Sequence, residues 1–289
     1  MDLSIIYGIE VLNAIAVLVI MSLGLAVVFG MMKIVNMAHG EFMMLGGYSA
    51  IMATNHFGVP IWISMLVVAP LCVGVFGMVI ERVIIRHLYG RMIDTMLATW
   101  GLSLALIGAA TMLFGNTTLG ISSPLPSVNV GSYSTSGYSL FMIVFALCLV
   151  AALWLLLRFT TLGLCARATM QNARMAAALG SNPGKIYSLT FGLGAALSGL
   201  GGALLAPITG VIPTIGVSFI AKAFITVIGG GSAIIAGTLT SSTLFGTISQ
   251  LVTYLSTPVF GAVALLLSAI VLLRLLPQGI TGRFFRRSL

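Results

Sequence analysis

The stretch LFMIVFALCLVAALWLLL, residues 140–157, contains no charged side chain and no hydroxyl, amide or imidazole group. An α-helix crosses the hydrocarbon core of a bilayer in about 20 predominantly apolar residues, and this stretch with its apolar flanks reaches that length. Backbone amides inside lipid have no water to bond, so a spanning segment of this kind must form a helix. The sequence therefore predicts an all-α membrane protein.

Apolar segments of similar length recur along the chain. Hydrophobic residues make up 59% of it and charged residues only 6%, whereas about 25% of residues are charged in a typical soluble domain. We expect a polytopic protein with about eight to nine transmembrane segments, including a glycine-broken pair, in a single domain over residues 1–289. The segments lie at about 5–31, 35–54, 59–80, 94–114, 139–158, 188–208, 218–252 and 258–277.

The basic residues predict the orientation of these segments. They cluster in the linkers 81–94 and 158–185 and in the tail 283–289, which the positive-inside rule places in the cytoplasm. The loop at about 115–138 carries no charge, and no Lys or Arg precedes Lys33, so this loop and the N-terminus are expected outside. The net charge of +8 is thus a feature of topology and indicates no nucleic-acid partner.

Segment 218–252 is too long for one ordinary span and is interrupted by Gly229, Gly230 and Gly231. The preceding span leaves the cytoplasm and the last span returns to it, so this segment must begin and end outside. Two half-spans that meet at the glycines would let the segment begin and end on the same side of the membrane. Helices broken in this way are tolerated where protein or a water-filled cavity covers the loosened backbone.

A weak internal repeat points in the same direction. HGEFMMLGG (39–47) can be laid over GGSAIIAGT (230–238), which pairs Gly40 with Gly231, Glu41 with Ser232 and Gly46 with Gly237. Duplicated halves with glycine-interrupted segments at matching places are typical of transporters. Chance also produces such matches in a chain with 34 glycines, so both interpretations of the repeat stay open.

The chain lacks the sequence motifs of enzymes. GSNPGKIYS (180–188) departs from a P-loop, because only three residues separate its glycines and Ile186, not Ser or Thr, directly follows its lysine. No nucleophile elbow, zinc-binding helix or close pair of carboxylates occurs. Cys72, Cys148 and Cys165 have no metal-ligand spacing. We expect no catalytic residue, no metal site and no cofactor bound by this chain.

Ionisable groups inside a span are costly and by default functional, so they are the first candidates for a substrate path. Glu41 and His39 lead, since Glu41 is one of only five acidic residues and both begin an apolar segment. In the structural alternative, Glu41 locks helices together, Lys222 extends to the interface and Trp100 packs or lies in the interfacial belt. The full set of candidates is Asn36, His39, Glu41, Tyr48, Thr99, Trp100, Lys222 and Ser232.

The cytoplasmic stretch RATMQNARMAAALGSNPGKIYSLTF (167–191) contains a short helix-forming run, Met175–Leu179, which Gly180 and then Asn182-Pro183 end. The run is too short to span a bilayer and too exposed to form core. It suits an element that docks on a cytoplasmic partner. An ordinary linker with one helical turn is the other interpretation.

Four stretches carry a resemblance that extends over essentially the whole chain. IVNMAHGEFMMLGGY (34–48), AAALG (176–180), KAFITVIGGGSAIIAG (222–237) and RLLPQGITGR (274–283) resemble the permease subunits of ABC importers of the branched-chain amino acid family. Residues 80–106 and 168–180 look like the urea and short-chain amide branch, in which a Trp follows Leu-Ala-Thr and a Gln-Asn pair precedes the docking helix.

The resemblance implies a permease that imports urea or a short amide. Met170 stands where that branch is expected to have Thr, so branched-chain amino acids are the alternative substrate. A passive channel for small neutral solutes is the alternative of another class. It leaves the 167–185 loop without a role.

The resemblance also implies the partners of such a permease, which is not an enzyme. They are a second homologous permease, two cytoplasmic subunits that bind ATP and Mg²⁺, and an extracytoplasmic substrate-binding protein at the bacterial inner membrane. The short helix would be the coupling helix that rests on an ATPase, within a coupling loop at about 159–187. The implied coupling residues are Arg174, Met175, Ala176, Ala177, Ala178, Leu179 and Gly180.

Overall fold

A computed structural model of the protein describes residues 2–130, 133–231 and 233–284. The chain forms two compact units, which we name after their longest internal helices. The α9 unit comprises Leu23–Ile121 and Ala151–Ala221, and the α11 unit comprises Met1–Ser22, Ser122–Val150 and Lys222–Leu289. Helices α1 (Asp2–Met32), α6 (Gly137–Phe159) and α10 (Ile215–Gly230) contribute residues to both.

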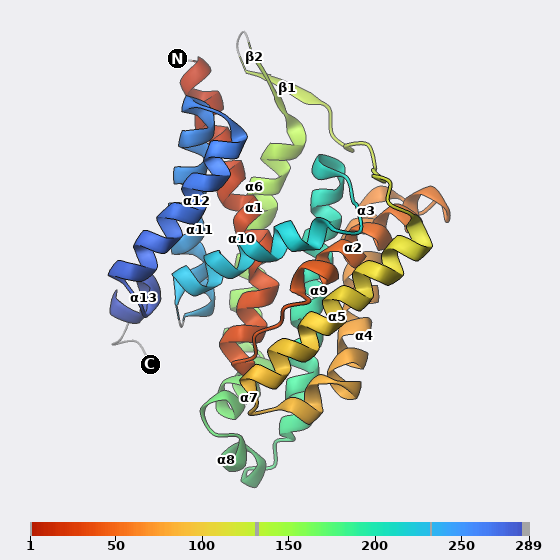
Figure 1. Cartoon of the computed structure of the whole chain (residues 1–289), viewed down its shortest axis with the longest axis vertical. Helices are drawn as coiled ribbons and strands as arrows, with labels where there is room; N and C mark the ends of the chain where they lie inside the picture. The colour runs from red at the N-terminus through yellow and green to blue at the C-terminus, as the bar shows by residue number, and fades with distance from the viewer. Residues whose placement is uncertain (1, 131–132, 232, 285–289) are drawn as a thin grey trace. The chain divides into compact units, whose positions relative to one another are not determined.

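In the α9 unit, helix α9 (Pro183–Thr209) packs along α2 (His39–Asn55) and α4 (Ala69–Val83) (Figure 1). Its run of small residues permits this close packing, as is common between membrane helices. A Cβ atom at Gly46 would lie 2.0 Å from the Gly199 carbonyl oxygen, so the two backbones are nearly in contact. Around this seam lies an apolar core that includes Phe42, Val73 and Phe191.

Shorter elements complete the α9 unit. The span that ends with α4 begins with α3 (Ile61–Ile63) and a π-helical turn, η1 (Ser64–Val68). Pro70 follows this turn closely and cannot donate a backbone hydrogen bond. The 3₁₀ turn η2 (Ile85–Leu88) connects α4 to α5 (Met92–Phe114). Two short helices, α7 (Thr161–Gln171) and α8 (Ala173–Ala178), precede α9.

In the α11 unit, α11 (Ile234–Leu255) packs against α12 (Pro258–Leu275), and α13 (Gly279–Phe284) contacts α11; all three are blue in Figure 1. The core here consists of Phe245, Leu265, Ala269 and Leu272, with Leu18 of α1. The strands β1 (Ser127–Val130) and β2 (Tyr133–Ser136) form an antiparallel hairpin in which Ser127 pairs with Ser136.

Each of the eight apolar segments expected from the sequence contains a helix, but the expected count of eight to nine spans is not confirmed. Among the described residues, six helices are long and apolar enough to cross a membrane, and the pair α10–α11 raises the number to seven. Helix α2 is shorter, with 17 residues. The break predicted at the glycines is confirmed, because α10 ends at Gly230 and α11 begins at Ile234 after a bend of 113°.

Two elements differ from the sequence-based expectation. The loop expected at 115–138 contains the hairpin, and the linker expected before residue 188 contains α7, α8 and the first turn of α9. Helix α7 carries few large apolar residues, so hydropathy does not reveal it. It buries a narrow face of Gly163, Ala166 and Thr169, and its first turn is capped by the Thr160 hydroxyl, which accepts from Gly163 N.

Candidate functional site

The connection between α1 and α2 is a sharp turn of buried polar groups in the α9 unit. Lys33, directly after α1, adopts a left-handed backbone with φ of 53°, a conformation uncommon outside glycine. The Asn36 side-chain oxygen accepts a hydrogen bond from Ala38 N at 3.1 Å, and His39 N donates to the Asn36 carbonyl oxygen at 3.4 Å. Asn36 therefore shapes the turn that begins α2.

Thr99 of α5 attaches this turn to a second helix. Its hydroxyl oxygen accepts from Met37 N at 3.1 Å and donates to the Thr95 carbonyl oxygen at 2.8 Å, and the side chain is fully buried. The neighbouring Trp100 is 55% exposed and takes no part in this cluster. Thr99 thus holds the turn in place through backbone contacts.

His39, the first residue of α2, binds α9. Its Nδ1 lies 2.9 Å from the Ser198 hydroxyl oxygen, and that hydroxyl also lies 2.8 Å from the Gly194 carbonyl oxygen. A hydroxyl has one proton, so both contacts are satisfied when the serine donates to the carbonyl and His39 Nδ1 donates to the serine. The pair crosses 159 residues of sequence and fixes the first turn of α2 on α9.

Glu41 is 1% exposed and faces the start of α10. A Cβ atom added at Gly216 would lie 2.9 Å from Glu41 Oε1, and one added at Gly40 would lie 1.9 Å from the Gly216 carbonyl oxygen. Ser103 of α5 lies beside the Glu41 carboxyl group. Neither Glu41 Oε1 nor Glu41 Oε2 makes a hydrogen bond of ordinary geometry with the described residues. This burial favours the structural interpretation of Glu41.

Of the remaining sequence candidates, the structure describes Tyr48 and Lys222. Tyr48, two turns along α2, is 2% exposed, and its ring stacks on Phe114 with centroids 4.1 Å apart. Lys222 is exposed and belongs to the α11 unit. Ser232 lies outside the described residues. The structure therefore gathers Asn36, His39, Glu41 and Thr99 at the start of α2, and the exposed Trp100 side chain is not part of this cluster.

In the α11 unit, the break between α10 and α11 is held by the closing motif RLLPQGITGR. The Thr281 hydroxyl donates to the Gly230 carbonyl oxygen at 2.6 Å and accepts from Ala233 N at 3.3 Å. Gly231 has a φ of +86°, and a Cβ atom there would lie 2.7 Å from the Gln278 carbonyl oxygen. The Thr281 hydroxyl thus bonds one backbone group on each side of the break, and the backbone at Gln278 lies close to Gly231. Thr281 is not among the residues predicted from the sequence.

The predicted coupling segment forms helix α8, but it begins two residues earlier than expected. Asn172 is the N-terminal cap, and its side-chain oxygen accepts from Met175 N at 3.0 Å. The helix ends at Ala178, before Gly180 with its φ of +89°. Asn182, expected to stop the helix, also caps α9 by accepting from Lys185 N at 3.1 Å.

Helix α8 presents most of its surface to solvent. Ala176 is 3% exposed and faces the protein, whereas Met175 and Leu179 are 60% and 80% exposed. Arg174, Ala177, Ala178 and Gly180 are exposed as well. Two large apolar side chains on an exposed helix, with small alanines between them, form a compact contact surface.

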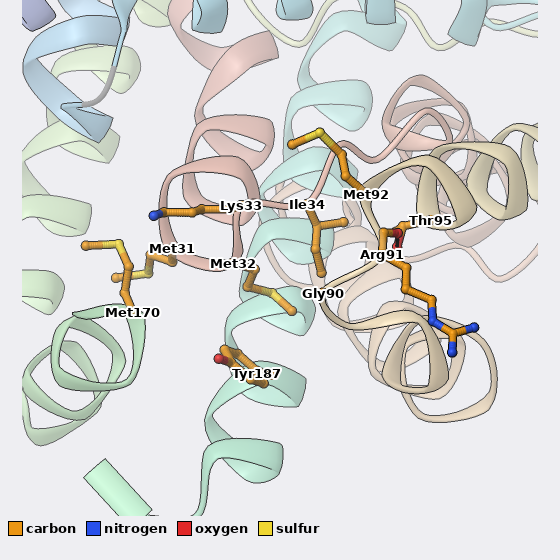
Figure 2. A pocket seen from close by; sticks show the side chains of 10 residues that line it. All are labelled: Met31, Met32, Lys33, Ile34, Gly90, Arg91, Met92, Thr95, Met170 and Tyr187. Atoms are coloured by element: carbon orange, nitrogen blue, oxygen red, sulfur yellow. Dashed lines mark hydrogen bonds between the residues drawn. The ribbon is translucent and has the colours of Figure 1, made fainter. Parts of the chain in front are cut away.

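A half-open cavity of about 370 Å³ lies in the α9 unit where the end of α1, the start of α5, α7 and α9 meet. Figure 2 shows the Lys33 ammonium group directed toward Met31 and Met170, while the Arg91 guanidinium group points to the opposite side. Arg91 also lies 3.8 Å from Asp94. The two cations do not converge on one point, so they do not form a paired anion site, and methionine side chains make up much of the lining.

A further polar cluster lies at the end of α4 and in the linker to α5, and no motif in the sequence marks it. Glu81 is fully buried, the Tyr89 hydroxyl donates to it, and Arg86 Nε lies 3.6 Å from its Oε1. The Tyr89 ring also contacts Tyr187 of α9, with centroids 4.8 Å apart. Burial, followed by the hydrogen bond to Glu81, raises the pKa of the Tyr89 phenol above its usual range. The cluster joins this linker to α9.

Within the described ranges, no group of three or more His, Cys, Asp or Glu side chains has the geometry to hold a metal ion. Cys72, Cys148 and Cys165 are free thiols.

Comparisons with known proteins agree on one family. The family model described as branched-chain amino acid transport system / permease component matches residues 7–276. LivH of Salmonella typhimurium, a high-affinity branched-chain amino acid transport system permease protein, is 30% identical over 283 residues, which is 91% of each chain. LivH of Escherichia coli strain K12 is 30% identical over 281 residues, again 91% of each chain. BraD of Pseudomonas aeruginosa is 31% identical over 244 residues, 78% of this chain and 79% of BraD. No solved structure gives a significant match.

Proposed function

Because the chain belongs to the family of branched-chain amino acid transport system permease components, we propose that it is a transmembrane subunit of an ATP-driven importer of branched-chain amino acids. Transport permeases of this family are not enzymes. The observation that carries the proposal is the match over 91% of both chains to relatives named for these substrates. Urea and short amides, favoured by the sequence motifs, gain no support from the relatives, and the alternative substrate fits better.

The importer requires partners that this chain does not supply. ATP and Mg²⁺ bind to two cytoplasmic ATPase subunits, a second homologous permease completes the path, and an extracytoplasmic protein delivers the substrate. In this assignment the permease lies in the bacterial inner membrane with its N-terminus outside and its C-terminus in the cytoplasm. The 17 residues of α2 extend about 26 Å at roughly 1.5 Å per residue, which suffices for an additional short span.

Coupling begins at α8. Its exposed residues Met175, Ala177 and Leu179 form the surface that docks on an ATPase. Only residues 179–182 separate α8 from α9, so movement of α8 transmits directly to α9. Helix α9 is packed along α2 and α4. At several glycines of these helices there is no room for even a Cβ atom. A displaced α9 therefore moves these helices together.

The buried polar turn keeps this rigid group in register. His39 joins α2 to α9, Thr99 joins the turn to α5, and Glu41 fills the space against Gly216. These residues position the helices beside the substrate path, and contact with the solute is left to other groups. The glycine break between α10 and α11 is the second irregular segment, in keeping with a path that lies between duplicated halves.

Docking is tested by Ala177→Arg, which places a long cation in the centre of the α8 surface. We expect the variant to insert in the membrane and to lose co-purification with the ATPase subunits. Ser134→Arg, at an exposed position of β2, is the matched control and should assemble normally. Normal assembly and ATP-driven uptake by Ala177→Arg would remove the coupling role of α8.

A further inference from the structure

A second cavity, of about 280 Å³ and half open, lies within the α11 unit between the first turns of α1 and the last turns of α11. Its polar groups come from Tyr7 and Glu10 of α1 and from Gln250 and Tyr254 of α11. Ile6, Val11 and Leu251 provide apolar walls. None of these residues has a role in the function proposed above.

Glu10 is the unusual member of this cavity. It is one of five acidic residues in the chain and lies inside the long apolar helix α1. Within the part of the chain that the structure describes, it forms no ion pair. An ionisable side chain within a membrane span is costly unless it is paired, so a partner for Glu10 is expected from outside the chain. A cationic group is the partner that would neutralise the carboxylate.

The aromatic rings specify the kind of cation. Tyr7 and Tyr254 have ring centroids 3.9 Å apart and planes tilted by 54°, and both line the cavity. Electron-rich ring faces next to a carboxylate attract ammonium groups. The apolar walls would accommodate an aliphatic chain attached to that ammonium group, and the Gln250 amide can donate to an anionic group on the same ligand.

We propose that this cavity binds a primary ammonium group attached to a short aliphatic body, which is the chemistry of a branched-chain amino acid. The volume of about 280 Å³ equals roughly nine water volumes of about 30 Å³ each, which is room for a small aliphatic amine. The identification of the ligand as an amino acid rests on the proposed function. The headgroup of phosphatidylethanolamine offers the same ammonium chemistry, so the experiment must separate the two sources.

The test measures binding of radiolabelled L-leucine to the full-length permease with its partner permease, without binding protein, in nanodiscs of phosphatidylglycerol only. We expect Glu10→Gln and Tyr254→Leu to weaken binding by about tenfold or more, while Tyr254→Phe keeps the ring and most of the affinity. The amine 3-methylbutylamine should compete, and 4-methylpentanoate, which lacks the ammonium group, should not. Asp94→Asn removes an acidic group far along the chain, outside the cavity, and should change nothing.

The lipid source is tested by adding phosphatidylethanolamine to the nanodiscs. If the lipid headgroup occupies the cavity, the lipid will raise the melting temperature of the wild type but not of Glu10→Gln, and leucine will show no Glu10-dependent binding. Either pattern supports the ammonium site. The ammonium site is overturned if leucine binding and the lipid-induced shift in melting temperature are the same in wild type, Glu10→Gln and Tyr254→Leu.

Uptake by the complete importer separates this inference from the proposed function. If wild-type complexes fail to take up leucine while the Glu10-dependent binding of 3-methylbutylamine persists, the substrate assignment fails and the cavity stands. If ATP-driven leucine uptake is normal and no ligand depends on Glu10, the cavity inference alone is wrong.

Discussion

Replacing Thr281 by Val tests whether the closing motif holds the glycine break in the α11 unit. Valine has nearly the shape of threonine but no hydroxyl group, so packing is retained. The substitution removes the 2.6 Å hydrogen bond to the Gly230 carbonyl oxygen and the 3.3 Å bond from Ala233 N. Thr281 is 2% exposed, so water cannot replace either contact without a local rearrangement.

The size of the effect follows from these two contacts. A buried polar group that loses its partner costs about 1–3 kcal/mol, and hydrogen bonds between membrane helices average nearer to about 0.6 kcal/mol. The bond to Gly230 is short and the one from Ala233 is long, so we expect a total of about 1–3 kcal/mol for opening the break. This corresponds to a population of the open form about 5- to 150-fold larger.

Hydrogen exchange measured by mass spectrometry in nanodiscs detects this opening. Peptides that cover the end of α10 and the start of α11 should exchange faster in Thr281→Val, and peptides from α9 should not change. Thr281→Ser keeps the hydroxyl and should protect the break. Thr243→Val removes an exposed hydroxyl that bonds only to its own helix, at the Leu239 carbonyl oxygen, and is the control for general loosening. Wild-type protection of the break in Thr281→Val would refute the reasoning.

Three substitutions test the α9 unit. Gly40→Ala places a Cβ atom 1.9 Å from the Gly216 carbonyl oxygen. Overpacking of this kind costs about 1–3 kcal/mol, so the melting temperature should fall. An unchanged melting temperature would contradict this close approach. Ser198→Ala removes the hydroxyl that lies 2.9 Å from His39 Nδ1 and should cost about 1–3 kcal/mol in chemical denaturation. Wild-type stability of this variant would exclude the hydrogen bond as a structural lock. Folding raises the pKa of Tyr89, so the wild type should lose stability as the pH rises above about 10, the pKa of the unfolded phenol. Tyr89→Phe should lack this loss, and parallel alkaline decline in both proteins would show that Tyr89 is not its source.

The helical architecture is largely predictable, because the length of each apolar segment can be counted in the sequence. The break after Gly230 is predictable for a related reason: consecutive glycines weaken a helix wherever they occur. Helix α7 was not predicted, because its buried face consists of Gly163, Ala166 and Thr169, which hydropathy does not mark. The hairpin was not predicted because its strands pair with each other and contain no long apolar run.

The candidate site was predictable only in part. Scarcity of charge within apolar segments singles out His39 and Glu41, and both are buried. The same reasoning selected Lys222, which is exposed, since composition does not say which way a side chain points. Ser198 and Thr281 were missed because a hydroxyl residue among glycines and leucines carries no local signal. Their roles depend on partners far away in the sequence or on backbone groups.

The central claim is that this chain is a permease of an ATP-driven importer of branched-chain amino acids. It is tested most directly in proteoliposomes that contain the permease with its second permease and ATPase subunits, supplied with the binding protein. The account predicts uptake of radiolabelled L-leucine that requires ATP and the binding protein and is blocked by excess isoleucine or valine but not by urea. ATP-driven uptake of urea, or leucine flux that persists without ATP, would contradict it.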